Sequence, residues 1–238
     1  MSSETLEPKR RTILPDALIA FALSAASTGV CFALCGASLQ LFLAGFFFTT
    51  LILPPMTLTH ASIKHRLLIG ACVVDGVGLI WLCSIASPQI TFVQWLKCYV
   101  VLICYATSLA GMVMLLVRLR VAPIFASAIA TILSLSWLTW PVWLSPYLRG
   151  PRAETLANDL TSIHPLFAIN GVLAHLGAWT HFPIAYQHLT TLGQDVPYTL
   201  PRSIWPASLL HLGIGVTCWL CLLAGPLAGR DTPSKLAR

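Results

Sequence analysis

Asp75 is an acidic residue inside an apolar stretch long enough to cross a membrane, within the sequence CVVDGVG at residues 72–78. An acid in the middle of a membrane-spanning helix costs on the order of 2.5 kcal/mol or more unless it is paired, protonated or hydrated. Asp75 is therefore a candidate for a substrate path. The alternative is a hydrogen bond between helices, which close approach at Gly76 and Gly78 would favour. Candidate partners are Thr107, Ser108 and His211.

Histidine is concentrated in the last third of the chain, where five of the seven lie: His164, His175, His181, His188 and His211. Neutral imidazole binds metals and haem iron and titrates near physiological pH. His211, like Asp75, is a candidate for the substrate path or for an interhelical polar contact. The other four histidines and Asn170 are candidate functional residues of a segment predicted to lie outside the membrane. His175, His181 and His188 are the candidate metal ligands, but their spacing matches no compact motif, so interfacial histidines are the alternative and no metal site is predicted.

Motifs that would indicate an enzyme are absent from the sequence. It contains no phosphate-binding loop of the form G-x-x-x-x-G-K-[ST], no G-x-G-x-x-G, no H-E-x-x-H and no G-x-S-x-G. The eight cysteines all fall in apolar stretches, where cysteine acts as a small apolar residue. We therefore expect no catalytic residue and no cofactor bound by this chain.

The amino-acid composition indicates whether water or lipid surrounds the protein. Of its 238 residues 57% are hydrophobic and only 9% are charged, and the mean hydropathy is +0.80. A soluble domain carries about 25% charged residues. A soluble globule, a disordered chain, a coiled coil and a nucleic-acid-binding domain are all poor interpretations, despite the net charge of +6. The sequence predicts an all-α polytopic membrane protein surrounded by lipid.

Six apolar runs are long enough to span a bilayer, which takes roughly 20 residues per helix. We expect one membrane domain over 1–238, with spans at about 13–35, 37–55, 67–87, 92–117, 121–145 and 206–228. Ten of the fourteen Lys and Arg residues fall on the side of the termini. The positive-inside rule therefore makes both tails, 1–12 and 229–238, cytoplasmic, in a bacterial-type inner membrane.

The segment 146–205 is predicted to lie outside, between the fifth and sixth spans. Its polar first part is followed by an apolar stretch at 166–179, which is too short to cross the bilayer. A re-entrant or interfacial helix is the structure that such a stretch favours. Pro165 precedes it and Pro183 follows it, as expected at the ends of a helix.

One part of the chain resembles a known family over roughly residues 105–228. From Tyr105 it reads YATSLAGMVMLLVRLRVAPIFASAIATILSLSWLTWPVWLSPYL, and LTSIHPLFAINGVL follows at 160–173. This resembles the permease subunits of ABC-2-type exporters, in which a His-Pro-Leu segment leads into re-entrant helices before the last span. The resemblance implies a homodimeric permease in contact with lipid and with a separate cytoplasmic ATPase, so that ATP would act through the partner. The chain departs from the family between the second and third spans, where residues 56–66 contain no acid.

Two other hypotheses remain open on the sequence. The histidines are compatible with a redox subunit associated with haem or quinone. Small-residue faces at 20–24 and 225–229 are compatible with a structural or assembly subunit of a larger membrane complex. An export permease is the first hypothesis, with an unidentified substrate.

Overall fold

The computed structural model describes residues 13–58, 63–177, 190, 192 and 196–224, and its architecture is all-α. The long helices are α1 (Ile13–Cys35), α2 (Leu39–Thr57), α3 (Ile63–Cys83), α4 (Phe92–Arg118), α5 (Pro123–Leu138) and α9 (Trp205–Ala224). The short ones are η1 (Ser84–Ala86), α6 (Trp140–Trp143), η2 (Ser145–Tyr147), α7 (Ala153–Ile163), α8 (Pro165–Val172) and η3 (Ala174–Leu176).

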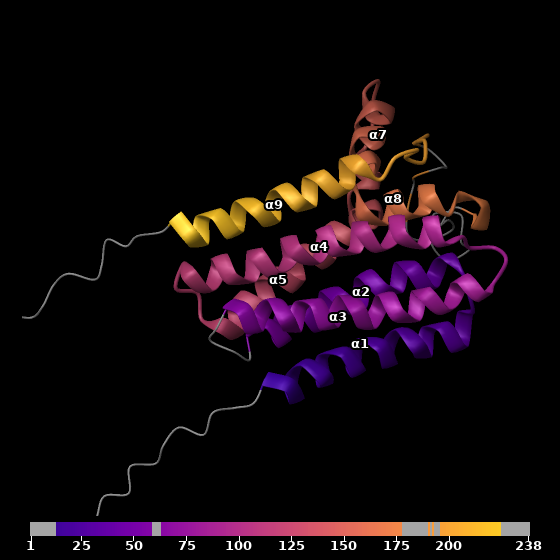
Figure 1. Cartoon of the computed structure of the whole chain (residues 1–238). Helices are drawn as coiled ribbons and strands as arrows, with labels where there is room; N and C mark the ends of the chain where they lie inside the picture. Colours follow the sequence, from indigo (N-terminus) through magenta and orange to yellow (C-terminus); the bar gives the residue numbers. More distant parts are fainter. Residues whose placement is uncertain (1–12, 59–62, 178–189, 191, 193–195, 225–238) are drawn as a thin grey trace, which may run out of the picture.

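Five of these helices, α1, α2, α3, α4 and α9, are long and apolar enough to cross a membrane. A sixth crossing is present if α5 and α6, which are bent by 61° at their junction, count as one broken span. The chain is thus a multi-pass membrane protein. In Figure 1 α1 begins and α9 ends at the same end of the bundle, which an even number of crossings requires.

Both ends of α1 and α4 and the start of α9 agree with the sequence prediction to within one residue, and other helix ends differ. α2 continues through Pro54 and Pro55 to Thr57, and α3 begins four residues earlier than the predicted span, at Ile63. The predicted span at 121–145 is not one continuous helix but a bent pair. Its first helix, α5, ends at Leu138, because Pro141 has no N–H to continue the helical ladder, and the chain then turns into α6. The last four residues of the predicted span 206–228 lie outside the described residues.

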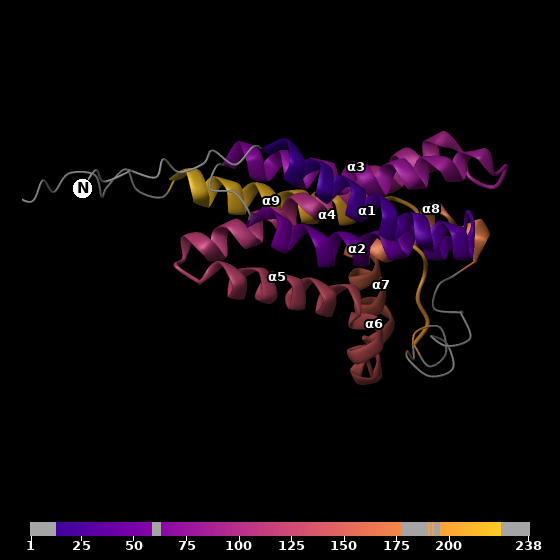
Figure 2. The same cartoon turned by 90° about the horizontal axis from the view of Figure 1, so that it is seen from below.

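The long helices lie side by side with α4 at the centre (Figures 1 and 2). α4 packs along α9 on one side and contacts α2, α3 and α5 on its others, while α1 packs along α3. The core between α2, α3 and α4 is aromatic: the ring of Trp81 lies 4.8 Å from Phe42 and 6.0 Å from Phe46 between ring centroids, and Phe46 lies 5.3 Å from Tyr105. This core fixes the rotation of α3 and α4 about their axes.

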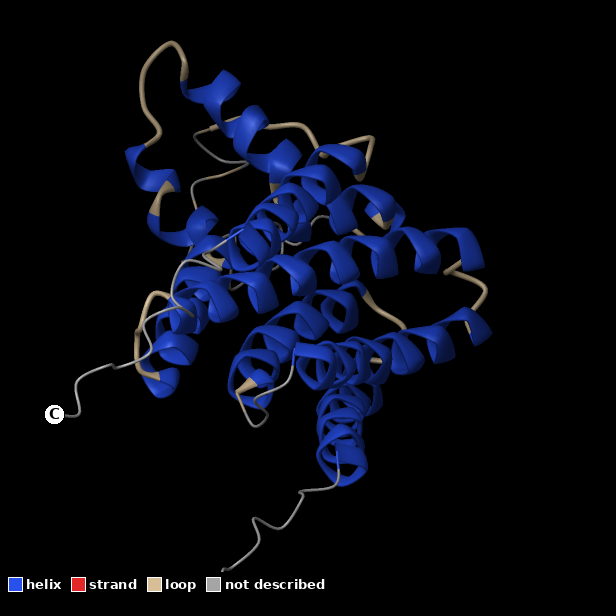
Figure 3. Cartoon of the chain, turned by 60° about the vertical axis from the view of Figure 1, so that its left-hand side comes forward, coloured by secondary structure: helices blue, strands red, loops and turns tan. Residues whose placement is uncertain are grey.

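The segment between α5 and α9 folds back on the ends of the long helices. α7 crosses their direction, and α8 packs against α4 and α2 (Figures 1 and 3). The predicted apolar helix at 166–179 is shorter than expected. It begins at Pro165 and ends at Val172, and a 3-10 turn, η3, follows; Trp179 lies outside the described residues.

Candidate functional site

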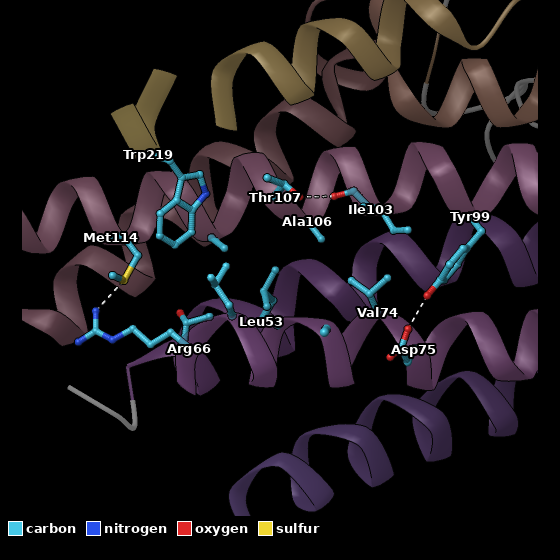
Figure 4. A pocket seen from close by; sticks show the side chains of 15 residues that line it. Leu53, Arg66, Val74, Asp75, Tyr99, Ile103, Ala106, Thr107, Met114 and Trp219 are labelled. Carbon is cyan, nitrogen blue, oxygen red and sulfur yellow. Dashed lines mark hydrogen bonds between the residues drawn. The ribbon is translucent and has the colours of Figure 1, made fainter. Parts of the chain in front are cut away.

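A cavity of about 250 Å³ lies between α3 and α4, with contributions from α2 and α9 (Figure 4). Its walls are mainly apolar and include Leu53, Val74, Ile103, Ala106, Ala110 and Trp219. Two charged residues of α3 line it as well, Arg66 and Asp75. The cavity therefore combines an apolar body with a small number of charged groups, which is the usual make-up of a small-molecule site.

Asp75 is held from the neighbouring helix by Tyr99, whose hydroxyl donates a hydrogen bond to the carboxylate atom Oδ1 (Figure 4). Among the described residues Tyr99 is the one hydrogen-bond partner of Asp75. Asp75 is exposed rather than packed into the core. The second carboxylate oxygen is thus available to a ligand or to a proton.

Gly78 determines where Tyr99 lies. A Cβ atom at Gly78 would come within 2.8 Å of Cδ2 of the Tyr99 ring, so the ring occupies the space that a side chain would fill. The ring of Trp95 stacks on Tyr99 at 5.2 Å with an interplanar angle of 10°, and its Nε1 donates to the carbonyl of Gly78 at 3.2 Å. Phe92 stacks on Trp95 in turn at 5.3 Å. We call Phe92, Trp95 and Tyr99 the aromatic ladder. It runs along α4 from Phe92, the first residue of the helix, to Tyr99, which contacts Asp75 on α3.

Arg66 lies at the other end of the cavity, near the start of α3. Its Nη1 is 2.6 Å from Sδ of Met114 on α4, and Trp219 of α9 lies close to both in Figure 4. Asp75 follows Arg66 by nine positions on α3, which corresponds to about 14 Å along a helix that rises 1.5 Å per residue. The cavity is therefore polar at its two ends and apolar between them.

A second polar cluster connects the centres of four helices, and we call it the core network. Tyr105 on α4 shares a hydrogen bond of 2.6 Å with Thr50 on α2. His211 on α9 lies 5.5 Å from the Tyr105 ring. Its Nδ1 is 2.7 Å from the carbonyl of Ala207, and its Nε2 accepts from Nε1 of Trp137 at 3.3 Å.

These contacts define the protonation of His211. A carbonyl only accepts, so Nδ1 carries the proton and Nε2 is the acceptor for the Trp137 indole. His211 is therefore a neutral imidazole with both nitrogens engaged. To coordinate a haem iron or another metal ion, His211 would have to break one of these two hydrogen bonds.

His164 lies at the junction of α7 and α8 and is fully buried. Its Nε2 donates to the carbonyl of Trp137 at 3.0 Å. That carbonyl has no helical partner four residues later, because residue 141 is proline. Burial lowers the pKa of His164 from 6.5 to about 3, while the bond to Trp137 opposes this shift. The ring lies among Trp137, Trp140 and Phe167, and its Nδ1 is buried without a hydrogen-bond partner in the described part of the chain.

The other predicted site residues lie apart from the cavity. Asn170 is buried in α8 and donates from Nδ2 to the carbonyl of Gly177 at 2.7 Å. His175, in η3, is exposed, with its Nε2 2.7 Å from the carbonyl of Gln89. His181 and His188 lie outside the described residues. Within the ranges that are described, no three His, Cys, Asp or Glu side chains come together as a metal site.

None of the three predicted partners of Asp75 forms a hydrogen bond with it; the partner is Tyr99. Thr107 lines the same cavity, but its hydroxyl bonds to the carbonyl of Ile103 at 2.8 Å, and Ser108 bonds to that of Tyr105 at 2.7 Å. His211 belongs to the core network instead. The sequence holds a signal for Tyr99: α3 and α4 are neighbours joined by a short connection, and the two residues lie at similar distances from it.

Comparisons with protein-family models, with curated proteins and with solved structures give no match for this chain. The class of protein that the fold defines is a multi-pass membrane protein. The function therefore has to be argued from the site itself.

Proposed function

We propose that this protein is a membrane transport subunit, the permease of an ABC-type exporter that works as a homodimer with a separate cytoplasmic ATPase. The observation that carries the proposal is the α3–α4 cavity with Asp75 on its wall. Polar groups within the membrane layer are costly and generally mark pathways for substrates or ions.

The magnitudes favour a functional role for Asp75 over a purely structural one. An ionised acid at the centre of a spanning helix costs about 2.5–3.5 kcal/mol. Hydrogen bonds between membrane helices contribute about 0.6 kcal/mol on average and at most about 1.7 kcal/mol. The bond from Tyr99 therefore offsets only part of the cost. A bound cation would supply the remainder, as expected of a residue on a substrate path.

The segment between α5 and α9 supports the permease plan. Two helices, α7 and α8, return to the bundle before the last long helix, and α8 contacts α4 and α2. His164 and Asn170 are both buried where this segment meets the bundle. Such a folded-back segment is what the resemblance to ABC-2-type permeases implies near the outer exit.

Energy would come from a partner, because the sequence contains no phosphate-binding loop. The proposed contact lies on the side of the basic residues, which the positive-inside rule makes cytoplasmic. A substrate would then pass between two copies of the bundle, and the cavity would be a binding station within each copy.

The test is purification of the tagged full chain in mild detergent, followed by assay of ATP hydrolysis in lipid vesicles. We expect an ATPase to copurify and hydrolysis by the vesicle-bound complex to fall several-fold in Asp75→Asn. Asp16→Asn, which removes an acid from the first turn of α1, is the matched control and should leave hydrolysis unchanged. Recovery of the chain without an ATPase, or hydrolysis indifferent to Asp75, would contradict the proposal.

A further inference from the structure

The two ends of the α3–α4 cavity differ in charge. Asp75 and the Tyr99 hydroxyl form one end, and Arg66 forms the other, about 14 Å away along α3. A ligand that fills the cavity meets a negative charge at the end nearer the aromatic ladder and a positive charge at the far end. The site therefore distinguishes the two ends of an elongated molecule.

At the Asp75 end the protein provides two features that attract cations. The first is the carboxylate, which has a single hydrogen bond from Tyr99 and an exposed side chain. The second is the ring of Tyr99, which lines the cavity as Asp75 does; aromatic ring faces carry partial negative charge and attract organic cations within about 6 Å. The Asp75 carboxylate and the Tyr99 ring together favour a positive charge on a molecule that is otherwise apolar.

Between the ends the walls suit an apolar body. Val74, Ala106 and Ala110 are aliphatic, and the indole of Trp219 covers the cavity from α9 (Figure 4). The volume of about 250 Å³ lies just under the usual 300–1,000 Å³ of small-molecule pockets. A compound with one ring or a short alkyl chain is the size that fits.

We propose that the α3–α4 cavity binds a lipophilic organic cation, an amine or a quaternary ammonium compound, with its charge against Asp75 and its apolar body between α3 and α4. The inference rests on the proposed transport function and names the substrate class of the same site. A polar or anionic tail on the ligand would point towards Arg66.

Binding is tested with the full chain in nanodiscs of zwitterionic phosphatidylcholine, with empty nanodiscs subtracted. The probe is radiolabelled benzyltrimethylammonium, whose charge does not change with pH. Two competitors of similar shape complete the set: neopentylbenzene, which is neutral, and benzylsulfonate, which is anionic. We expect the cation to bind at least tenfold more tightly than either competitor.

Variants locate the site. Asp75→Asn should weaken cation binding by about 10- to 100-fold, because it removes the Coulomb attraction between the carboxylate and the quaternary ammonium group, and it should leave binding of neopentylbenzene unaffected. Asp75→Glu keeps the charge and should retain the preference for the cation. Ala110→Leu fills the apolar part and should weaken both ligands, while Asp16→Asn is the control and should change neither.

Equal affinity of the wild-type chain for the cation and the neutral competitor would overturn the inference, as would cation binding that survives Asp75→Asn. A preference for benzylsulfonate that disappears in Arg66→Gln would overturn it in favour of an anionic ligand. If Asp75→Asn does not yield folded protein, the wild-type preference and Ala110→Leu decide the matter alone. Selective cation binding without any copurifying ATPase would refute the proposed exporter function but support the cation site. ATP hydrolysis by a copurifying ATPase, without cation selectivity, would support the exporter function and refute the cation site.

Discussion

Gly76→Ala is expected to weaken the attachment of α1 to the rest of the protein. α1 is held mainly by α3, and the buried residues on its inner face are small: Ala17, Ala20, Ser24 and Thr28. A Cβ at Gly76 would collide with Oγ of Ser24 and lie 2.7 Å from the carbonyl oxygen of Phe21 and 3.1 Å from the nitrogen of Ala25. Two of these three atoms belong to the backbone of α1, so no change of rotamer relieves the overlap and the helices have to separate.

The magnitude follows from two opposing effects. Overpacking of a well-packed interface costs typically 1–3 kcal/mol. Replacing a glycine inside a helix by alanine returns about 0.5–1 kcal/mol of helix propensity. Gly76→Ala should therefore lower the free energy of unfolding by about 1–2 kcal/mol, or the melting temperature by several degrees for a chain of this length.

Gly29→Ala is the matched control, because it tests propensity without overlap. The nearest atom to a Cβ there is Cδ1 of Ile80 at 3.8 Å, an ordinary van der Waals contact. This variant should gain about 0.5–1 kcal/mol. Both are measured by reversible unfolding in mixed detergent micelles. A Gly76→Ala protein as stable as wild type, or a Gly29→Ala protein that loses as much, would refute close packing of α1 on α3.

Two further variants test the core network and His164. Tyr105→Phe removes the hydrogen bond to Thr50 between α4 and α2 and should cost about 0.5–1.5 kcal/mol in the same unfolding assay, whereas Thr107→Val, which removes a bond within α4 only, should cost less. His164 has a folded pKa of about 3 against 6.5 when unfolded, so the unfolded state takes up a proton first as the pH falls. Stability should be full above pH 6.5 and decline towards pH 3, by roughly 2 kcal/mol at pH 5. His164→Gln should flatten this decline and His175→Gln should not; a profile independent of His164 would contradict its buried, neutral state.

Most of the fold could be predicted because lipid imposes a simple pattern on the sequence. α1 begins after a basic cluster and ends just before Gly36, which has a positive φ, and α4 ends at Arg118; such local signals predict these ends to within a residue. The start of α3 was missed because Lys64 and Arg66 are helical although charged; long basic side chains at a helix end reach the interface while their backbone continues the helix. The break after Leu138 was missed because hydropathy continues across Pro141, and only the backbone hydrogen bonds end there.

The candidate site was predictable in part for a different reason. Asp75 was found because an acid in an apolar run is costly wherever its partners lie. Tyr99 was not predicted, because the only signal for it is its similar distance from the α3–α4 connection, and that signal becomes usable only once α3 and α4 are known to pack side by side. Ala20 and Ser24, interpreted as a face for another subunit, are buried on the α3 side of α1 within this chain. A small-residue stripe thus predicts close packing but not which helix packs on it.

The contrast between the two polar clusters explains why the function is placed at Asp75 and not at His211. In the core network both nitrogens of His211 have hydrogen-bond partners and the Tyr105 hydroxyl shares a bond with Thr50, so these groups need no external partner. Such a network fixes how α2, α4, α5 and α9 pack, and a ligand would have to displace existing bonds. His211 and Tyr105 also border a cavity, of about 260 Å³, so open volume does not distinguish the two clusters. Asp75 differs because it is an acid in a spanning helix and its one hydrogen bond offsets only part of the cost of its charge. A ligand that adds bonds at Asp75 gains free energy without breaking any, and this makes the α3–α4 cavity the favourable place for binding.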